Sequence, residues 1–153
     1  MDLILWRHAE AAEGMPDDAR PLTAKGRRQA ERMAHFLSGR LPQNTRILVS
    51  PALRAQQTAA ALTEHFVTAP NLDTHATPQA AIATAGWPLG GSAVLLVGHQ
   101  PWMGELAALL MTGDAKSRNI WSIKKGAVWW FSRREREGDF QTVLRLVISP
   151  EHL

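Results

Sequence analysis

The amino-acid sequence predicts an α/β fold of three layers, in which helices cover both faces of a mostly parallel central sheet. Short apolar stretches typical of buried strands, at residues 2–7, 46–50 and 93–97, alternate with stretches of helical periodicity over the first two-thirds of the chain. The stretch 93–97 is apolar on both faces, as expected in a parallel sheet that is covered on both sides. Two further strands, at 127–132 and 140–148, are predicted to form a C-terminal β-hairpin.

The first half of the chain contains two predicted strand–helix units. A polar loop follows the strand 2–7, and Thr23 is a candidate N-cap for the next helix. The buried face of that helix is predicted to be Ala30, Met33, Ala34 and Leu37. We interpret Ser50, which precedes a proline, as part of the turn that ends the strand 46–50 rather than as a nucleophile. The second helix is predicted at 52–66, with a buried stripe of Ala55, Ala59, Leu62 and Phe66.

The middle of the chain is less regular. Residues 69–92 are rich in proline and glycine, and we predict only a short strand around 71–74 and a short helix around 79–84. After the strand 93–97, Gln100 is a candidate cap for a helix that has Pro101 at its first position. The apolar face of this helix is predicted to be Met103, Leu106, Ala107 and Leu110.

Length and composition restrict the class of protein. A chain of 153 residues is expected to form one domain, residues 1–153, and its 45% hydrophobic content is typical of a soluble globular protein. The chain has no cysteine, which excludes disulfides and thiolate metal sites. It also lacks the features of a signal peptide and of a membrane span, so we expect a cytoplasmic protein that does not bind membranes. A net charge of +3 favours anionic ligands, but no sequence pattern of a nucleic-acid-binding module supports nucleic acid as the partner.

Two histidines directly follow predicted buried strands. Arg7 and His8 end the first strand, and Gly98 and His99 follow the most apolar one. Ligands of open parallel sheets bind beyond the carboxyl ends of the strands, so we expect both histidines at one edge of the sheet. A neutral imidazole can accept a phosphoryl group into a covalent intermediate. A protonated His99 could hold a phosphoryl oxygen, and such a pair predicts a rate optimum between two titrations.

Three arginines could complete an anion site at this edge. Arg7 is adjacent to His8, Arg20 lies in the loop after the first strand, and Arg54 begins the second helix. Guanidinium donors are planar and forked, which suits a tetrahedral oxyanion, and phosphoryl transfer mainly requires positioning and charge neutralisation. Gly98 would allow the backbone to approach the ligand closely. Taken singly, each arginine could equally be a solvated surface charge.

Four segments resemble motifs of the histidine phosphatase superfamily, which has the phosphoglycerate mutase-like fold. They occur in the order of the family, within residues 1–112, and are Arg7-His8-Ala9-Glu10, residues 20–30, residues 49–58 and residues 97–101. The Arg-Pro pair that opens the second segment, and the short chain, are similar to the SixA-type phosphohistidine phosphatases. Ala9 stands where the family has glycine.

The resemblance implies a phosphatase in which His8 is the nucleophile. Arg7, Arg54 and His99 would hold the phosphoryl group, with Arg20 as a further ligand, and water would hydrolyse the phosphohistidine intermediate. We expect no cofactor and no metal, because the sequence has no cluster of metal ligands at a recognisable spacing.

The sequence leaves the general acid and the substrate open. Glu10, Asp17 and Asp18 are the nearest carboxylates, but each could equally be a solvated loop residue. SixA-type members resemble this chain in lacking the usual acid, and imidazole leaves phosphorus more readily than an alkoxide does, so acid catalysis is less needed. The expected substrate is therefore phosphohistidine in a protein. The alternatives are a small phosphorylated metabolite and a non-catalytic module that binds phosphoryl groups.

Overall fold

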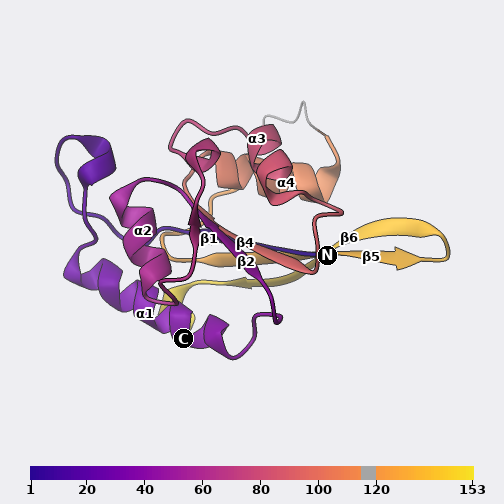
Figure 1. The fold of residues 1–153 in the computed structure, drawn as a ribbon, viewed down its shortest axis with the longest axis horizontal. Helices are drawn as coiled ribbons and strands as arrows, with labels where there is room; N and C mark the ends of the chain where they lie inside the picture. The colour runs from indigo at the N-terminus through magenta and orange to yellow at the C-terminus, as the bar shows by residue number, and fades with distance from the viewer. Residues whose placement is uncertain (115–119) are drawn as a thin grey trace.

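The computed structural model describes residues 1–114 and 120–153. Its strands are β1 (Asp2–Arg7), β2 (Arg46–Val49), β3 (Val67–Thr68), β4 (Ala93–Gly98), β5 (Val128–Arg136) and β6 (Asp139–Ile148). They form one sheet in the order β3-β2-β4-β1-β5-β6 (Figure 1). The first four strands of this order pair in parallel, whereas β5 and β6 are antiparallel. The predicted α/β fold, with a mostly parallel sheet and a C-terminal hairpin, is thereby confirmed.

Helices cover both faces of the sheet. The described helices are α1 (Ala24–Ser38), α2 (Leu53–Ala60), α3 (Pro78–Ala85) and α4 (Trp102–Thr112). Figure 1 shows α1 and α2 on one side of the sheet and α3 and α4 on the other. Alternate residues of β1 contribute to the two resulting cores: Ile4 and Trp6 pack with α1 and α2, and Leu3 and Leu5 pack with α3 and α4. The chain therefore has the three predicted layers.

Capping residues fix where the helices begin. The Thr23 hydroxyl accepts a hydrogen bond from the Gly26 amide at 3.0 Å, and α1 buries the face that its periodicity predicts. Pro101 immediately precedes α4 instead of being its first helical residue. The amide oxygen of Gln100 nevertheless accepts a hydrogen bond from the Gly104 amide at 2.8 Å, as a capping side chain would.

Two elements differ from the prediction. Helix α2 ends at Ala60 rather than at residue 66, although Leu62 and Phe66 still pack against the core from the connection to β3. Their helical spacing therefore reflects burial and not continuation of the helix. The short strand β3 lies before Pro70 instead of at 71–74, where a turn of 3₁₀ helix buries Leu72. Pro70 is unsuited to continue the strand, because proline lacks the N–H that a hydrogen bond between strands needs.

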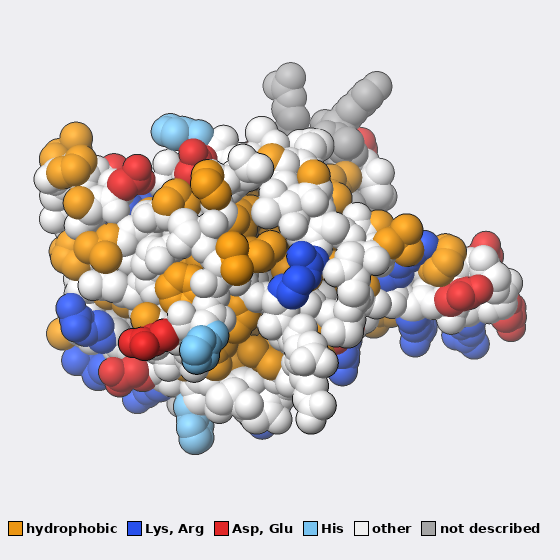
Figure 2. Space-filling model, in the orientation of Figure 1, with side chains coloured by type: hydrophobic (Ala, Val, Ile, Leu, Met, Phe, Trp, Pro, Cys, Tyr) orange, Lys and Arg blue, Asp and Glu red, His pale blue; other side chains and the backbone are white. Residues whose placement is uncertain are grey.

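The β5–β6 hairpin extends beyond the body of the molecule. Figure 1 shows it projecting from the sheet, and Figure 2 shows Lys and Arg side chains along one edge and Asp and Glu side chains near its tip. Near the tip, the Arg133 guanidinium lies 3.5 Å from the centre of the Phe140 ring. Across the described ranges, no helix combines the length and the apolar character that crossing a bilayer requires.

Candidate active site

The register of the parallel strands brings three polar side chains together. Arg7 of β1 pairs with Gly98 of β4, so His8 and His99 are each one residue beyond a paired position. The His8 amide donates to the Gly98 carbonyl at 3.0 Å, which extends the ladder by one residue, to His8. The two imidazole rings lie 5.1 Å apart between centroids, and both side chains are buried. Ser50 occupies the equivalent place after β2: Val49, the last residue of β2, pairs with Val97 of β4, and the Ser50 amide donates to the Val97 carbonyl at 3.0 Å.

A pocket of about 430 Å³ opens at this edge of the sheet. Its walls contain six residues that the sequence suggested: Arg7, His8, Asp17, Arg20, Arg54 and His99. The other lining residues are Thr74, His75, Gln100 and Lys125. With four Arg and Lys side chains and a single carboxylate among the lining residues that the structure describes, the pocket is suited to an anion.

The surroundings of His8 keep its imidazole neutral and oriented. Its Nδ1 lies 2.7 Å from the Ala9 carbonyl oxygen, and because a carbonyl can only accept, we assign the ring proton to Nδ1. The lone pair of the neutral ring is therefore on Nε2. Burial, followed by the charges of Arg54, Arg7 and Lys125, lowers the pKa of His8 to about 4, although the Ala9 hydrogen bond acts in the opposite direction. The ring is neutral at pH 7.

His99 is held by Ser50. Its Nε2 lies 2.6 Å from the Ser50 Oγ, which also accepts a hydrogen bond from the Ala52 amide at 3.2 Å. If the hydroxyl donates to Nε2, then of this pair just the Nδ1–H of His99 lacks a partner among the described residues. The other tautomer would leave both the hydroxyl proton and Nδ1 unpaired. We therefore assign the proton to Nδ1, where it can be donated to a ligand.

The expectation that His99 is protonated is not supported. Burial, followed by the charges of His8 and Arg54, lowers the pKa of His99 to about 3, although Asp17 acts in the opposite direction. In the unliganded protein His99 is thus a neutral hydrogen-bond donor and not a cation.

Asp17 organises the arginines. Its carboxylate accepts a hydrogen bond from Arg54 at 3.0 Å and another from Arg20 at 2.9 Å, and its backbone carbonyl accepts from Arg54 at 2.8 Å. These two hydrogen-bonded arginines, Arg20 first, hold the pKa of Asp17 below its usual value. Asp17 is therefore ionised at neutral pH in the unliganded protein.

A buried threonine connects the histidine loop to α2. The Ala9 amide donates to Thr58 Oγ1 at 3.0 Å, and the Thr58 hydroxyl donates to the Arg54 carbonyl at 2.7 Å. Thr58 and Ala9 are both fully buried. The loop that carries His8 and the helix turn that carries Arg54 are thus fixed relative to each other.

Several buried donors of the pocket have no partner. Arg7 Nε, Arg54 Nε and His99 Nδ1 form no hydrogen bond with any residue that the structure describes. An unpaired buried polar group costs about 1–3 kcal/mol, so such groups require an explanation. All three belong to residues that line the same pocket, and an oxyanion bound there could accept hydrogen bonds from them.

Three of the suggested residues lie outside the pocket. Neither Asp18, which is exposed, nor Glu10, which faces Lys25 at 3.8 Å, is among the lining residues. Gly98 is buried beneath Trp102, and a Cβ at this position would overlap the indole ring. Glycine is therefore needed here for packing, and not for the approach of a ligand to the backbone.

Ser50 and Lys125 were missed as site residues. Ser50, which contacts His99 and does not line the pocket, carries a signal that could have been used, because it follows a short buried strand as both histidines do. Lys125 lies in a stretch without a recognisable motif, and nothing in the sequence points to it. Within residues 1–114 and 120–153, no group of three or more His, Asp or Glu side chains is placed to hold a metal ion.

Comparison with known proteins identifies relatives of this chain. The sequence profile of the histidine phosphatase superfamily (branch 1) matches residues 3–76. The phosphohistidine phosphatase SixA of Escherichia coli strain K12 is 31% identical over 123 residues, which cover 74% of this chain and 76% of that protein. An uncharacterised protein of Picosynechococcus sp. (strain ATCC 27264 / PCC 7002 / PR-6) is 32% identical, covering 100% of this chain and 99% of that protein. Among solved structures, the protein histidine phosphatase SixA complexed with tungstate matches with a TM-score of 0.82 at 27% identity, over 99% of both chains.

Proposed function

Because the chain belongs to the histidine phosphatase superfamily, we propose that it hydrolyses phosphohistidine in a protein, through a phosphoryl group carried on His8. The family membership makes it a phosphatase; the substrate and the role of each residue are the proposal. The similarity to a phosphohistidine phosphatase over three-quarters of the chain supports the substrate class. The tungstate in a SixA structure supports an oxyanion site, because tungstate is tetrahedral like phosphate.

In the first step, Nε2 of His8 attacks phosphorus. The bond from phosphorus to the substrate imidazole breaks, and that ring leaves with the electron pair, as a neutral imidazole if its other nitrogen is protonated. Arg7, Arg54 and the Nδ1–H of His99 would bind the phosphoryl oxygens, which supplies the charge neutralisation that phosphoryl transfer needs. The neutral state of His8 supports its role as nucleophile.

In the second step, water attacks the phosphoryl group on His8. The bond between phosphorus and Nε2 breaks, and both protons of the water remain with the released dihydrogen phosphate. The hydrogen bond to the Ala9 carbonyl keeps a proton on Nδ1, so the phosphorylated ring is cationic and leaves as a neutral imidazole. This step therefore needs no additional proton donor.

The choice of substrate rests on the ionisation state of Asp17, the carboxylate of the pocket. Asp17 is the acidic residue among the described lining residues, and its pKa is lowered by Arg20 and Arg54. A phosphate ester needs a proton for its leaving alkoxide, and general acid catalysis contributes about 10²–10⁴-fold. A phosphohistidine substrate does not need this proton, so the pocket suits a phosphorus–nitrogen bond better than a phosphate ester.

A panel of substrates tests the proposal. Wild type and His8→Ala are assayed on a histidine-phosphorylated protein, free phosphohistidine, sugar phosphates and an aryl phosphate, with and without EDTA. We expect turnover of the phosphohistidine substrates by wild type alone, unchanged by EDTA, and a phosphoryl group on His8 detected by mass spectrometry after rapid mixing. Turnover restricted to the esters would indicate a metabolite phosphatase. Binding of phosphate without turnover of any substrate would indicate a non-catalytic module.

A further inference from the structure

A second basic surface adjoins the catalytic pocket. Two depressions, of about 310 and 250 Å³, share Gln29, Pro150 and Glu151 in their walls, and the larger shares Arg7 and Lys125 with the catalytic pocket. The shared walls make the three depressions neighbours along one path from the catalytic pocket to α1. We call the two outer depressions the basic groove; its cationic residues are Arg7, Lys25, Arg28, Arg32, Lys124 and Lys125.

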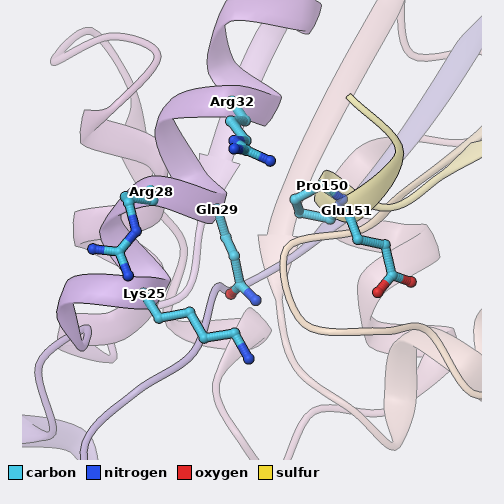
Figure 3. Close-up of a pocket in the computed structure, with 6 residues that line it drawn as sticks. All are labelled: Lys25, Arg28, Gln29, Arg32, Pro150 and Glu151. Carbon is cyan, nitrogen blue, oxygen red and sulfur yellow. The ribbon is translucent and has the colours of Figure 1, made fainter.

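The periodicity of α1 creates one wall of this groove. Lys25, Arg28 and Arg32 are spaced by three and four residues, so they lie along the same side of the helix, away from its buried residues. Figure 3 shows Lys25, Gln29 and Arg32 extending from α1 towards the turn that carries Pro150 and Glu151. The opposite wall is thus provided by the C-terminal residues, which fold back against α1.

The positive charge of the groove is largely uncompensated. Lys124 forms an ion pair with Glu151 at 2.7 Å, and Lys25 lies 3.8 Å from Glu10. Arg28, Arg32 and Lys125 form no ion pair with any residue of the described ranges. Glu151 is the acidic member of the described walls, and it is already paired. The groove therefore extends the positive potential of the pocket well beyond the reacting histidines.

We propose that the basic groove docks an acidic surface of the phosphoprotein substrate, beside the phosphohistidine that enters the catalytic pocket. This inference rests on the proposed function. A phosphorylated metabolite that fits the catalytic pocket would not need the groove, whereas a folded protein presents side chains on both sides of its phosphohistidine. The walls that the structure describes contain no aromatic side chain, and single-stranded nucleic acids usually stack on such side chains, so an acidic protein surface fits better.

The test is charge reversal in the groove. The double variant Arg28→Glu/Arg32→Glu is compared with wild type on a small acidic protein phosphorylated with phosphoramidate on one exposed histidine, and on free phosphohistidine. We expect KM for the phosphoprotein to rise about tenfold or more, since steering by charge contributes at least this much. We expect kcat on the protein, and both constants on free phosphohistidine, to stay within about twofold of wild type.

Arg27→Glu is the matched control. Arg27 is exposed on the same helix but borders a different depression, together with Glu31. It should leave KM for the phosphoprotein unchanged. Added salt should raise this KM more for wild type than for the double variant, because the variant has lost two of the groove charges that salt would screen. Should the double variant fail to fold, Arg28→Gln/Arg32→Gln tests the same contacts with a smaller expected rise.

The outcomes separate the two proposals. If wild type hydrolyses the phosphoprotein and the double variant has the same KM, the groove proposal is overturned and the proposed function stands. If wild type hydrolyses only esters, both proposals fall. If the double variant loses affinity for a single-stranded oligonucleotide while its KM for the phosphoprotein is unchanged, the groove binds nucleic acid and the docking proposal is wrong.

Discussion

Ser50 Oγ and His99 Nε2 lie 2.6 Å apart at the ends of two neighbouring parallel strands, β2 and β4. Ser50 is fully buried, and the bond leaves the Nδ1–H of His99 available to a ligand. In the proposed mechanism the serine would act on the phosphoryl group only through His99, as a positioning residue.

Replacement of Ser50 by alanine should weaken phosphoryl binding without unfolding the protein. Loss of the hydroxyl allows His99 to adopt the other tautomer, which presents a lone pair to an anionic oxygen. We expect kcat/KM to fall about tenfold, equivalent to one hydrogen bond of about 1.4 kcal/mol. Ser132→Ala, which removes a hydroxyl bonded to Asp2 far from the pocket, is the control. Equal losses in the two variants would show that Ser50 has only a structural role.

Replacement of Asp17 by asparagine should leave turnover nearly intact. Asp17 is ionised at neutral pH, so the variant removes a charge and not a proton donor. We expect kcat on phosphohistidine to stay within about tenfold of wild type, compared with the 10²–10⁴-fold loss of a general acid. Inhibition by inorganic phosphate should become stronger, because the pocket loses its negative charge. A loss of kcat above a hundredfold would instead identify Asp17 as the acid.

Replacement of Arg54 by alanine should reduce turnover far more than stability. The Arg54 side chain is buried at the pocket, and its ion-pair partner, Asp17, is half exposed and can be hydrated in the variant. Loss of one such donor costs about 10²–10³-fold in kcat. Arg20→Ala is expected to have a smaller effect, because Arg20 is more exposed than Arg54. Urea unfolding of the same samples shows whether the loss of activity follows the loss of stability.

Activity should persist well below the ordinary pKa of histidine. Burial lowers the pKa of His8 to about 4, so in the unliganded protein the imidazole of this proposed nucleophile is neutral at pH 5 and becomes protonated only on further acidification. The acid limb of the kcat/KM profile, corrected for ionisation of the substrate, should therefore lie near pH 4. An acid limb near pH 6.5 would show that His8 titrates as an exposed histidine does.

Stability should fall on acidification over a defined range. The folded-state pKa values of His8 and His99 are about 4 and about 3, below the ordinary value of 6.5. The unfolded chain therefore binds more protons between these values, and the free energy of unfolding decreases as pH falls below 6.5. Removal of one histidine, as in His99→Gln, should reduce the slope by up to about 1.4 kcal/mol per pH unit. Urea titrations between pH 4.5 and 7.5 measure this slope; identical slopes for wild type and variant would contradict the expectation.

The sequence predicted an element correctly where the pattern of apolar residues reflects the backbone conformation as well as burial. The strand at 93–97 is apolar throughout and was predicted within one residue, since only a strand covered on both faces needs such a stretch. The predicted end of α2 was wrong because Leu62 and Phe66 are partly buried although they lie in the connection between α2 and β3. Periodicity reports burial, whatever the backbone conformation. The strand at 71–74 failed because Leu72 is buried from a 3₁₀ turn.

The candidate site was only partly predictable. His8 and His99 could be placed together because, in a parallel sheet, it is enough to know where two neighbouring strands end. The contacts of Asp17 depend on the path of the loop after β1. Lys125 reaches the pocket from the connection before β5, and no sequence pattern predicts the conformation of that connection. Glu10 is near His8 in sequence and yet lies outside the pocket, so proximity in sequence was a poor guide to the carboxylate.

Helix α1 presents two separate sets of residues, one facing the sheet and one facing away from it. Its inward set, which includes Met33 and Leu37, joins the helix to the sheet, while its outward set, which includes Arg28 and Arg32, borders the basic groove and is exposed. Substitutions of the outward set leave the core and the imidazoles untouched. A homologue of this chain could therefore acquire different protein substrates through charge substitutions on this one helix, while the residues of the catalytic pocket stay the same.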